Sequence, residues 1–271
     1  MFFLNIRCAP EEKDILIANL WERGSTGIVE GDLPGGWCSL RAYFDNDADA
    51  SALSGEFNAK SEAAENLDWI EIARERLQPM IVGARFFLVP EWRGDPTPPG
   101  RFRIAINSGL AFGTGAHETT RLALELVEEY VKPGMIFADV GAGSGILSEA
   151  AAHMGAALVV ACDVDATAVE VAVRNFRRAG IKALAFTGSA NALRSDSSDA
   201  ITANITPEWI VALAPEWMRV LRPGGFAILS GFEASDVDRV SRALLQAGAR
   251  IAEIRSEAEW RAVVAYRRGT A

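Results

Sequence analysis

The sequence predicts an α/β fold in which a mainly parallel, seven-stranded sheet follows a small α+β domain and a structured linker. Three observations lead to this prediction. Apolar runs of strand length alternate with longer amphipathic runs after residue 100, which is typical of βαβ units. The first sixty residues show a different order, and a segment rich in proline and glycine separates the two patterns. The 271 residues, about 1.8 typical domains of ~150 residues, accommodate one large and one small domain.

The first domain, residues 1–60, is predicted to begin with the order β-α-β-β. Apolar residues at helical spacing end before Gly24, and the turn-rich segment 31–36 separates two strand patterns. The expected strands are 2–7, 28–29 and 37–44, and the expected helices are 11–23 and 47–57. The linker, residues 61–100, is expected to hold a helix at 68–77 and a strand at 85–89 before the breaker at 95–100.

The second domain, residues 101–271, carries the alternating pattern of strands and helices. The last two predicted strands have no long crossover between them, so we expect an antiparallel hairpin at one edge of the parallel sheet. The expected strands are 136–140, 158–162, 183–187, 200–204, 227–230, 250–255 and 261–266. The expected helices are 119–131, 146–154, 166–179, 207–221 and 235–247.

Composition excludes several classes of protein. The 49% hydrophobic and 23% charged residues are typical of a globular chain. No window reaches the roughly 18 apolar residues of a membrane-spanning helix, and the amino terminus does not have the pattern of a signal peptide. We therefore expect a cytoplasmic protein with no membrane segment, and a compact monomer. The net charge of −9 argues against direct reading of nucleic acid through a broad basic surface.

The negative charge is concentrated at the amino-terminal end. Residues 1–66 hold 5 Lys/Arg and 12 Asp/Glu, a net −7, whereas residues 67–271 hold 22 and 24, a net −2. This distribution fits a basic protein partner, and it fits carboxylates that only keep the protein in solution equally well.

Neither the cysteines nor the histidines have the spacing of a metal site. Cys8, Cys38 and Cys162 are isolated thiols with no CxxC pair, and His117 and His153 are far from them in sequence. We interpret each cysteine as a small buried hydrophobic residue, and we expect no structural zinc and no disulfide framework.

The sharpest local signal is the turn Asp139-Val-Gly141-Ala-Gly143-Ser-Gly145, between a predicted strand and a predicted helix. Glycines there let the backbone approach a ligand, and the following helix offers free N–H groups. A dinucleotide site requires G-x-G-x-x-G, whereas these glycines are spaced G-x-G-x-G. Asp163 ends the next strand, where a carboxylate can accept both hydroxyls of a ribose. The pattern favours a nucleoside ligand without a pyrophosphate over a purely structural turn.

On these residues the chain resembles the class I S-adenosylmethionine-dependent methyltransferases, which have a Rossmann-like, seven-stranded fold. The segment 139–145 is similar to their first motif, Asp163 to their ribose-binding acid, and Leu221-Arg-Pro-Gly-Gly225 to the turn before their fifth strand. The resemblance implies S-adenosyl-L-methionine as the cofactor.

Two further segments are similar to the PrmA family, the ribosomal protein L-eleven methyltransferases. They are 107–124, which contains Phe-Gly-Thr-Gly followed by His-x-Thr-Thr, and Ala203-Asn204-Ile205. Shorter matches at 68–69, 77–80, 89–92 and 229–231 extend the resemblance over most of residues 68–267. It implies a protein N-methyltransferase that acts on lysine or N-terminal amines of the ribosomal protein, with the amino-terminal domain recognising that partner.

The resemblance implies cofactor contacts at four positions of this chain, Thr119, Gly141, Asp163 and Asn204. Further candidates for cofactor binding are Phe112, His117 and Gly143. Asn204 is also implied as the catalytic residue, because it falls at the reaction centre. Simpler roles stay open at this stage: Thr119 as an ordinary first-turn residue of a helix, Asn204 as a turn former, and His117 as a cap. Trp209 and Phe112 are candidates to line the acceptor pocket, or to pack in the core.

The sequence also departs from the family pattern, most notably at Thr206, where a larger apolar or aromatic residue is usual. Because Thr206 adjoins the expected acceptor site, the departure bears on the acceptor more than on the reaction. Three other readings therefore stay open: a protein-lysine methyltransferase with another acceptor, an NAD-dependent oxidoreductase, which the glycine spacing disfavours, and a binding module without catalysis.

Overall fold

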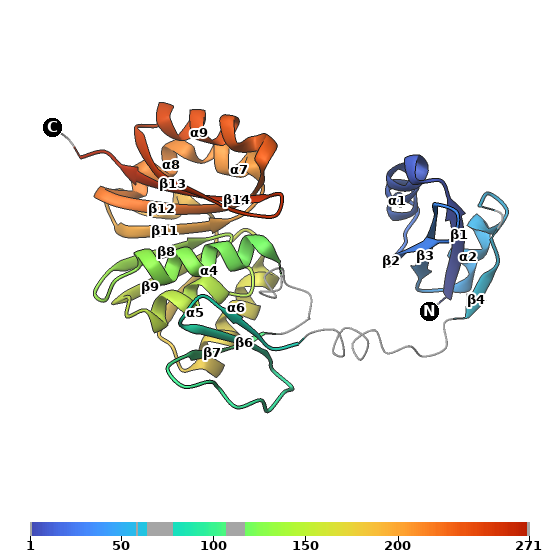
Figure 1. Cartoon of the computed structure of the whole chain (residues 1–271), viewed down its shortest axis with the longest axis horizontal. Coiled ribbons are helices and arrows are strands. Elements are labelled where there is room, and N and C mark those ends of the chain that lie inside the picture. The colour runs from blue at the N-terminus through green and yellow to red at the C-terminus, as the bar shows by residue number, and fades with distance from the viewer. Residues whose placement is uncertain (1, 58, 64–77, 107–116, 270–271) are drawn as a thin grey trace. The chain divides into compact units, whose positions relative to one another are not determined.

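The computed structural model describes residues 2–57, 59–63, 78–106 and 117–269. The chain divides into two compact units, Met1–Ile72 and Ala73–Ala271 (Figure 1). None of the helices in these described ranges is long and apolar enough to cross a membrane.

The amino-terminal unit is an antiparallel sheet covered by helices, with the strand order β2-β3-β1-β4. Its strands are β1 (Phe2–Cys8), β2 (Gly27–Leu33), β3 (Trp37–Phe44) and β4 (Ser61–Ala63). Its α-helices are α1 (Lys13–Glu22), which follows a short 3-10 turn at Pro10–Glu12, and α2 (Asp47–Ser54). Alternate strand residues face the helices and form the core with Leu20 and Leu53. The β-α-β-β-α order agrees with the sequence pattern, but β2 is much longer than the two residues expected.

The second unit begins with a small sheet of three strands, β5 (Met80–Val82), β6 (Phe86–Pro90) and β7 (Phe102–Ile106). Strands β6 and β7 pair in parallel, so the proline-rich segment 95–100 belongs to the connection between two paired strands. The sequence predicts a domain boundary after residue 100, and the strands on both sides of this position lie within the compact unit Ala73–Ala271. The helix expected at 68–77 lies outside the described residues.

The predicted seven-stranded sheet is confirmed, with the order β10-β9-β8-β11-β12-β14-β13. Pairing is parallel from β10 to β12 and antiparallel for β14 with both β12 and β13, as the missing crossover predicted. The strands are β8 (Ile136–Val140), β9 (Leu158–Asp163), β10 (Ala183–Thr187), β11 (Ser198–Asn204), β12 (Leu221–Glu233), β13 (Ala249–Glu257) and β14 (Trp260–Arg267).

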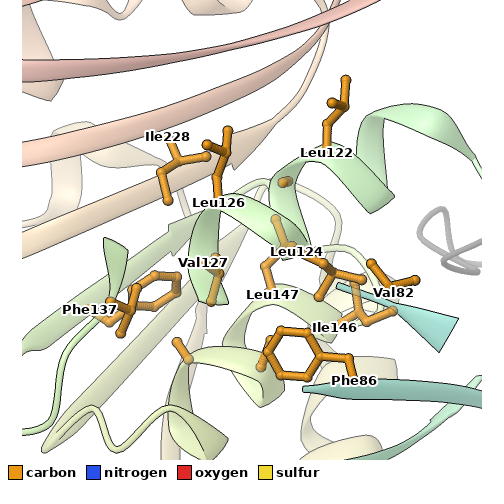
Figure 2. Packing of buried hydrophobic residues seen from close by; sticks show 14 of the residues in the cluster. Val82, Phe86, Leu122, Leu124, Leu126, Val127, Phe137, Ile146, Leu147 and Ile228 are labelled. Carbon is orange, nitrogen blue, oxygen red and sulfur yellow. The ribbon is translucent and has the colours of Figure 1, made fainter. Parts of the chain in front are cut away.

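Helices cover both faces of this sheet. One core lies between the sheet and α4 (Glu118–Tyr130) and α5 (Ile146–His153), where Leu124, Leu147 and Phe137 are buried (Figure 2). The other lies under α7 (Pro207–Ala212), α8 (Ala214–Val220) and α9 (Val237–Gln246). Successive strand residues enter opposite cores, because side chains alternate along a strand. The remaining helix, α6 (Ala166–Ala179), packs through Ala172 and Phe176.

Candidate active site at the carboxyl ends of the parallel strands

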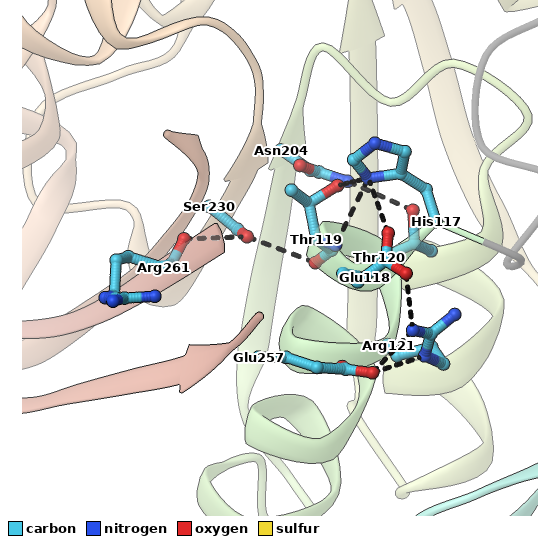
Figure 3. A network of polar contacts seen from close by, with 9 residues as sticks. All are labelled: His117, Glu118, Thr119, Thr120, Arg121, Asn204, Ser230, Glu257 and Arg261. Atoms are coloured by element: carbon cyan, nitrogen blue, oxygen red, sulfur yellow. Dashed lines mark hydrogen bonds and ion pairs between the residues drawn. The ribbon is translucent and has the colours of Figure 1, made fainter. Parts of the chain in front are cut away.

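The predicted site residues lie where neighbouring parallel strands end. The sheet order β9-β8-β11 places Asp163, Gly141 and Asn204 at one edge, because parallel strands end on the same side. The amino-terminal end of α4 reaches this edge through a hydrogen bond between Thr120 and Asn204 (Figure 3). Four segments that are distant in sequence thus supply one site.

The glycine turn after β8 adopts a backbone that requires glycine. Gly141, Gly143 and Gly145 have φ angles of +70°, +55° and +80°, in the left-handed region that side chains disfavour. A Cβ atom on Gly141 would overlap the Ile205 side chain, and one on Gly145 would overlap the Phe176 ring. The turn is therefore fixed both by its dihedral angles and by close packing against β11 and α6.

Asp139, just before this turn, is a structural carboxylate. Its side chain is 1% exposed and accepts hydrogen bonds from Ser148 N (3.1 Å), Ser148 Oγ (2.7 Å) and Thr202 Oγ1 (2.8 Å). These bonds join β8 to the first turn of α5 and to β11. Burial outweighs the three donors and raises the pKa of Asp139 to about 6.

Asp163 is the half-buried carboxylate at the end of β9. One oxygen accepts from Gly143 N (2.9 Å) and the other from Asp165 N (3.0 Å). Each carboxylate oxygen has a second lone pair, so the group can still accept from a pair of hydroxyls. Val164 follows immediately and is 76% exposed, an apolar surface beside the carboxylate. Val164 is not among the site residues predicted above, although a large apolar residue directly after the acid is a signal that the sequence contains.

Asn204 is held so that its oxygen has no partner. Its Nδ2 donates to Thr120 Oγ1 at 3.2 Å, while Oδ1 is buried without a hydrogen-bond partner in the described part of the chain. The next residue, Ile205, donates its N–H to Ser230 O (3.1 Å) and packs against Gly141 and Gly231. A buried acceptor left unpaired is costly, so an oxygen held in this way is available to accept a hydrogen bond from a bound ligand or substrate.

His117 is the N-cap of α4. The backbone N–H of Thr119 lies 3.3 Å from the His117 Nδ1, and Thr119 Oγ1 lies 2.9 Å from the same nitrogen. Thr119 is 1% exposed, and its carbonyl accepts from Ser230 Oγ at 3.1 Å. The structure thus shows His117 as a cap and Thr119 as a buried residue whose hydroxyl already has a partner.

A charged clamp holds the start of α4 against the antiparallel hairpin. Arg121 donates to Glu118 (3.0 Å) and through Nε to Glu257 (2.9 Å), and Glu257 ends β13 (Figure 3). The His117 ring also lies 4.8 Å from the ring of Trp260 in β14. No local sequence pattern predicts the contacts with Glu257 and Trp260, because these partners are more than one hundred residues away along the chain.

Six of the seven predicted positions thus gather at one edge of the sheet, since Phe112 lies outside the described residues. Trp209, on α7, is 61% exposed, so it does not pack in the core. Thr206 is the exposed N-cap residue of α7, two residues beyond Asn204. Within the described ranges no cluster of three His, Cys, Asp or Glu residues has a metal-binding arrangement.

The fold and this site define a class I S-adenosylmethionine-dependent methyltransferase. Residues 36–268 match the family described as ribosomal protein L11 methyltransferase (PrmA), and the chain belongs to this family. A ribosomal protein L11 methyltransferase of Desulforapulum autotrophicum is 34% identical over 260 residues, 94% of this chain and 86% of that protein.

Two further relatives agree. The protein of the same name from Deinococcus radiodurans is 33% identical over 262 residues, 92% of each chain. The crystal structure of a ribosomal protein L11 methylase from Lactobacillus delbrueckii subsp. bulgaricus superposes with a TM-score of 0.67 and 29% identity. That match covers 71% of this chain and 100% of the other.

Proposed function

We propose that this enzyme transfers methyl groups from S-adenosylmethionine to lysine or N-terminal amines of ribosomal protein L11. The observation that carries the proposal is the buried, unpaired Asn204 Oδ1 beside the glycine turn. The family membership supports the choice of acceptor. With a ribosomal protein as acceptor, the cytoplasmic location expected from the sequence belongs to the same proposal.

The residues present fit the cofactor. Asp163 keeps lone pairs for the ribose hydroxyls, Val164 offers an apolar surface for the base, and the turn at Gly141 lets the backbone approach the methionine part. Thr119 would contribute by shaping the pocket rather than through its hydroxyl, which His117 already binds. When bound, the cofactor supplies an activated methyl group whose transfer needs only an aligned nucleophile.

Asn204 is the residue we assign to the acceptor amine. Its Oδ1 can accept an N–H of the incoming amine and align the nitrogen lone pair, while Thr120 fixes the carboxamide. A neutral carboxamide accepts without holding the amine as a permanent cation, unlike a carboxylate. Losing the proton at pH 7 costs about 4.6 kcal/mol for a lysine of pKa 10.4 and about 1 kcal/mol for an α-amino group of pKa near 7.8. No described residue is placed as a dedicated base, so we assign the proton to water.

The direct test is methyl transfer from labelled S-adenosylmethionine to free large-subunit proteins and to ribosomal particles that lack prior methylation. Label on ribosomal protein L11, located by mass spectrometry, would support the proposal. Label on a different protein would be consistent with a methyltransferase but would show that the proposed acceptor is wrong. Tight cofactor binding without transfer to any amine would favour a non-catalytic module.

The role of Asn204 is tested by Asn204→Ala, which we expect to lower kcat about 100-fold with little change in cofactor affinity, because the amine loses its aligning acceptor. Thr120→Ser keeps the hydroxyl that holds the carboxamide and serves as the matched control, with near-normal kcat. Equal losses in cofactor affinity and kcat would show that Asn204 acts only through the cofactor.

A further inference from the structure

Two of the three cysteines, isolated in sequence, meet in the amino-terminal sheet. In the antiparallel pair of β1 and β3, Cys8 lies directly opposite Cys38. Opposite residues of an antiparallel pair point to the same face. Both side chains belong to the core on the helix side, where Cys8 is buried and Cys38 packs against its edge.

This register satisfies the reach of a disulfide. Directly opposite residues of antiparallel strands have Cα atoms about 4.5 Å or about 5.5 Å apart, depending on the type of pair. Disulfides span Cα separations of about 4.4–6.8 Å, so either type is compatible. The two residues end β1 and lie near the start of β3, so the strand ends can adjust without breaking the rest of the ladder.

We propose that Cys8 and Cys38 form an oxidisable dithiol, which a low-molecular-weight disulfide converts into a reversible disulfide bond within the chain. The Cys38 thiolate attacks one sulfur of the small disulfide, and one small thiol leaves. Cys8 then loses its proton and attacks Cys38, and the second small thiol leaves. Two protein thiols are oxidised while one small disulfide is reduced to two thiols.

The surroundings set the order of these steps. Cys8 is 2% exposed and both thiols are reduced, whereas Cys38 is partly exposed and meets the oxidant first. Burial, followed by the neighbouring Cys38, Glu12 and Glu30, raises the pKa of Cys8. Cys8 is therefore suited to resolve a bond already formed on its neighbour, not to begin the reaction.

Cys162 provides an internal control. It is 1% exposed inside the core of the second unit, and burial raises its pKa to about 12. It carries almost no thiolate at neutral pH, so it stays reduced under the same treatment.

The experiment treats the folded, full-length protein with oxidised glutathione, then denatures it and alkylates the remaining thiols. Mass spectrometry should show one alkylated cysteine, Cys162, and a Cys8–Cys38 bridge lighter by two hydrogens, at a yield independent of protein concentration. Dithiothreitol should restore all three thiols. A stable glutathione adduct on Cys38 with Cys8 still alkylated, or a dimer whose yield rises with concentration, would overturn the proposal.

Two variants separate the steps. Cys8→Ala, which keeps a small apolar side chain in the core, should retain a persistent glutathione adduct on Cys38. Cys38→Ser should leave Cys8 unmodified. Rapid modification of Cys8 in Cys38→Ser would contradict the order of reaction and, with it, the assigned roles of the two thiols.

Discussion

Asp139 lies one residue before the end of β8 and Asp163 ends the neighbouring strand β9, yet their carboxylates have different surroundings. Asp139 is buried and bonded to three donors, whereas Asp163 is half-buried and faces the edge of the sheet where the site lies. The same residue type is therefore a buried support for the turn at Asp139 and a partly exposed carboxylate at Asp163. Burial, rather than position in the motif, distinguishes the two roles.

The raised pKa of Asp139 predicts how stability depends on pH. Below its unfolded pKa of 3.8 both states hold the proton, and as pH rises towards about 6 the unfolded state releases it first. Wild type should thus lose up to about 3 kcal/mol relative to Asp139→Asn between pH 4 and pH 7. Urea unfolding of both proteins across this range measures the difference. If the difference in unfolding free energy between the two proteins stayed constant with pH, folding would not raise the pKa of Asp139.

Replacing Asp163 should weaken binding of the cofactor. Asp163→Asn removes the charged acceptor for two hydroxyls, so we expect an affinity about 10–100-fold lower by calorimetry. Asp165→Asn is the matched control, because Asp165 caps α6 at Thr167 N and asparagine caps equally well. If both variants bind the cofactor like wild type, Asp163 does not contact the ribose.

For individual residues, the sequence could predict types and positions but not hydrogen-bond partners. The left-handed turn at Gly141 follows from its residues alone. The free oxygen of Asn204 depends on Thr120, 84 residues away, and the Cys8–Cys38 pair depends on strand register. Such contacts are properties of tertiary structure, so the sequence alone shows Cys8 and Cys38 only as separate thiols without a CxxC pair.

Among the elements, strand β12 depends on one glycine near its carboxyl end, where its pairing with β14 shifts register. Gly231 has φ +99°, and a Cβ there would overlap the backbone carbonyl of Ile205, which cannot move aside without shifting Asn204. Gly248 has φ +93° with nothing within 4 Å of the added atom. Comparing an alanine substitution at each of the two glycines therefore separates the cost of dihedral strain from the cost of steric overlap.

We expect Gly231→Ala to lower the free energy of unfolding by at least about 2 kcal/mol more than Gly248→Ala, since both share the strain and only the first adds a clash. Chemical denaturation of the two variants measures this. Equal losses in the free energy of unfolding would mean that the backbone at Ile205 can shift at little cost.

The bounds of several elements follow from the local sequence, and those of others do not. The strands 136–140 and 183–187 and the helix 166–179 match the observed bounds, because apolar periodicity and caps mark them clearly. The expected helix 207–221 is instead α7 and α8, separated at Leu213, because Pro215 cannot continue a helix from the preceding turn. Three-residue strands such as β5 are defined by their partners, and no local pattern predicts them.

Across the whole molecule, charge separates the two ends of the chain. Residues 1–66 carry −7, and the rest carries −2. If the acidic part attracts a positively charged acceptor, kcat/KM should fall several-fold as salt rises from about 0.05 M to about 0.5 M, while cofactor affinity changes little. Steady-state kinetics and calorimetry at matched salt concentrations measure both.

A chain without residues 1–60 should act more slowly on the intact acceptor and show a weaker salt dependence; undiminished activity would exclude a recognition role for these residues.

The order of strands in the large sheet has a consequence for synthesis. Strand β14 lies between β12 and β13, although Trp260–Arg267 is made last of the three. Until residues 260–267 have been synthesised, β12 has an unpaired edge and β13 has no strand to pair with. The sheet therefore cannot be completed before this segment leaves the exit tunnel. The four strands of the first unit end at Ala63 and are available nearly two hundred residues earlier. During translation, the small sheet can thus be folded while the apolar strands of the large one are still incompletely paired.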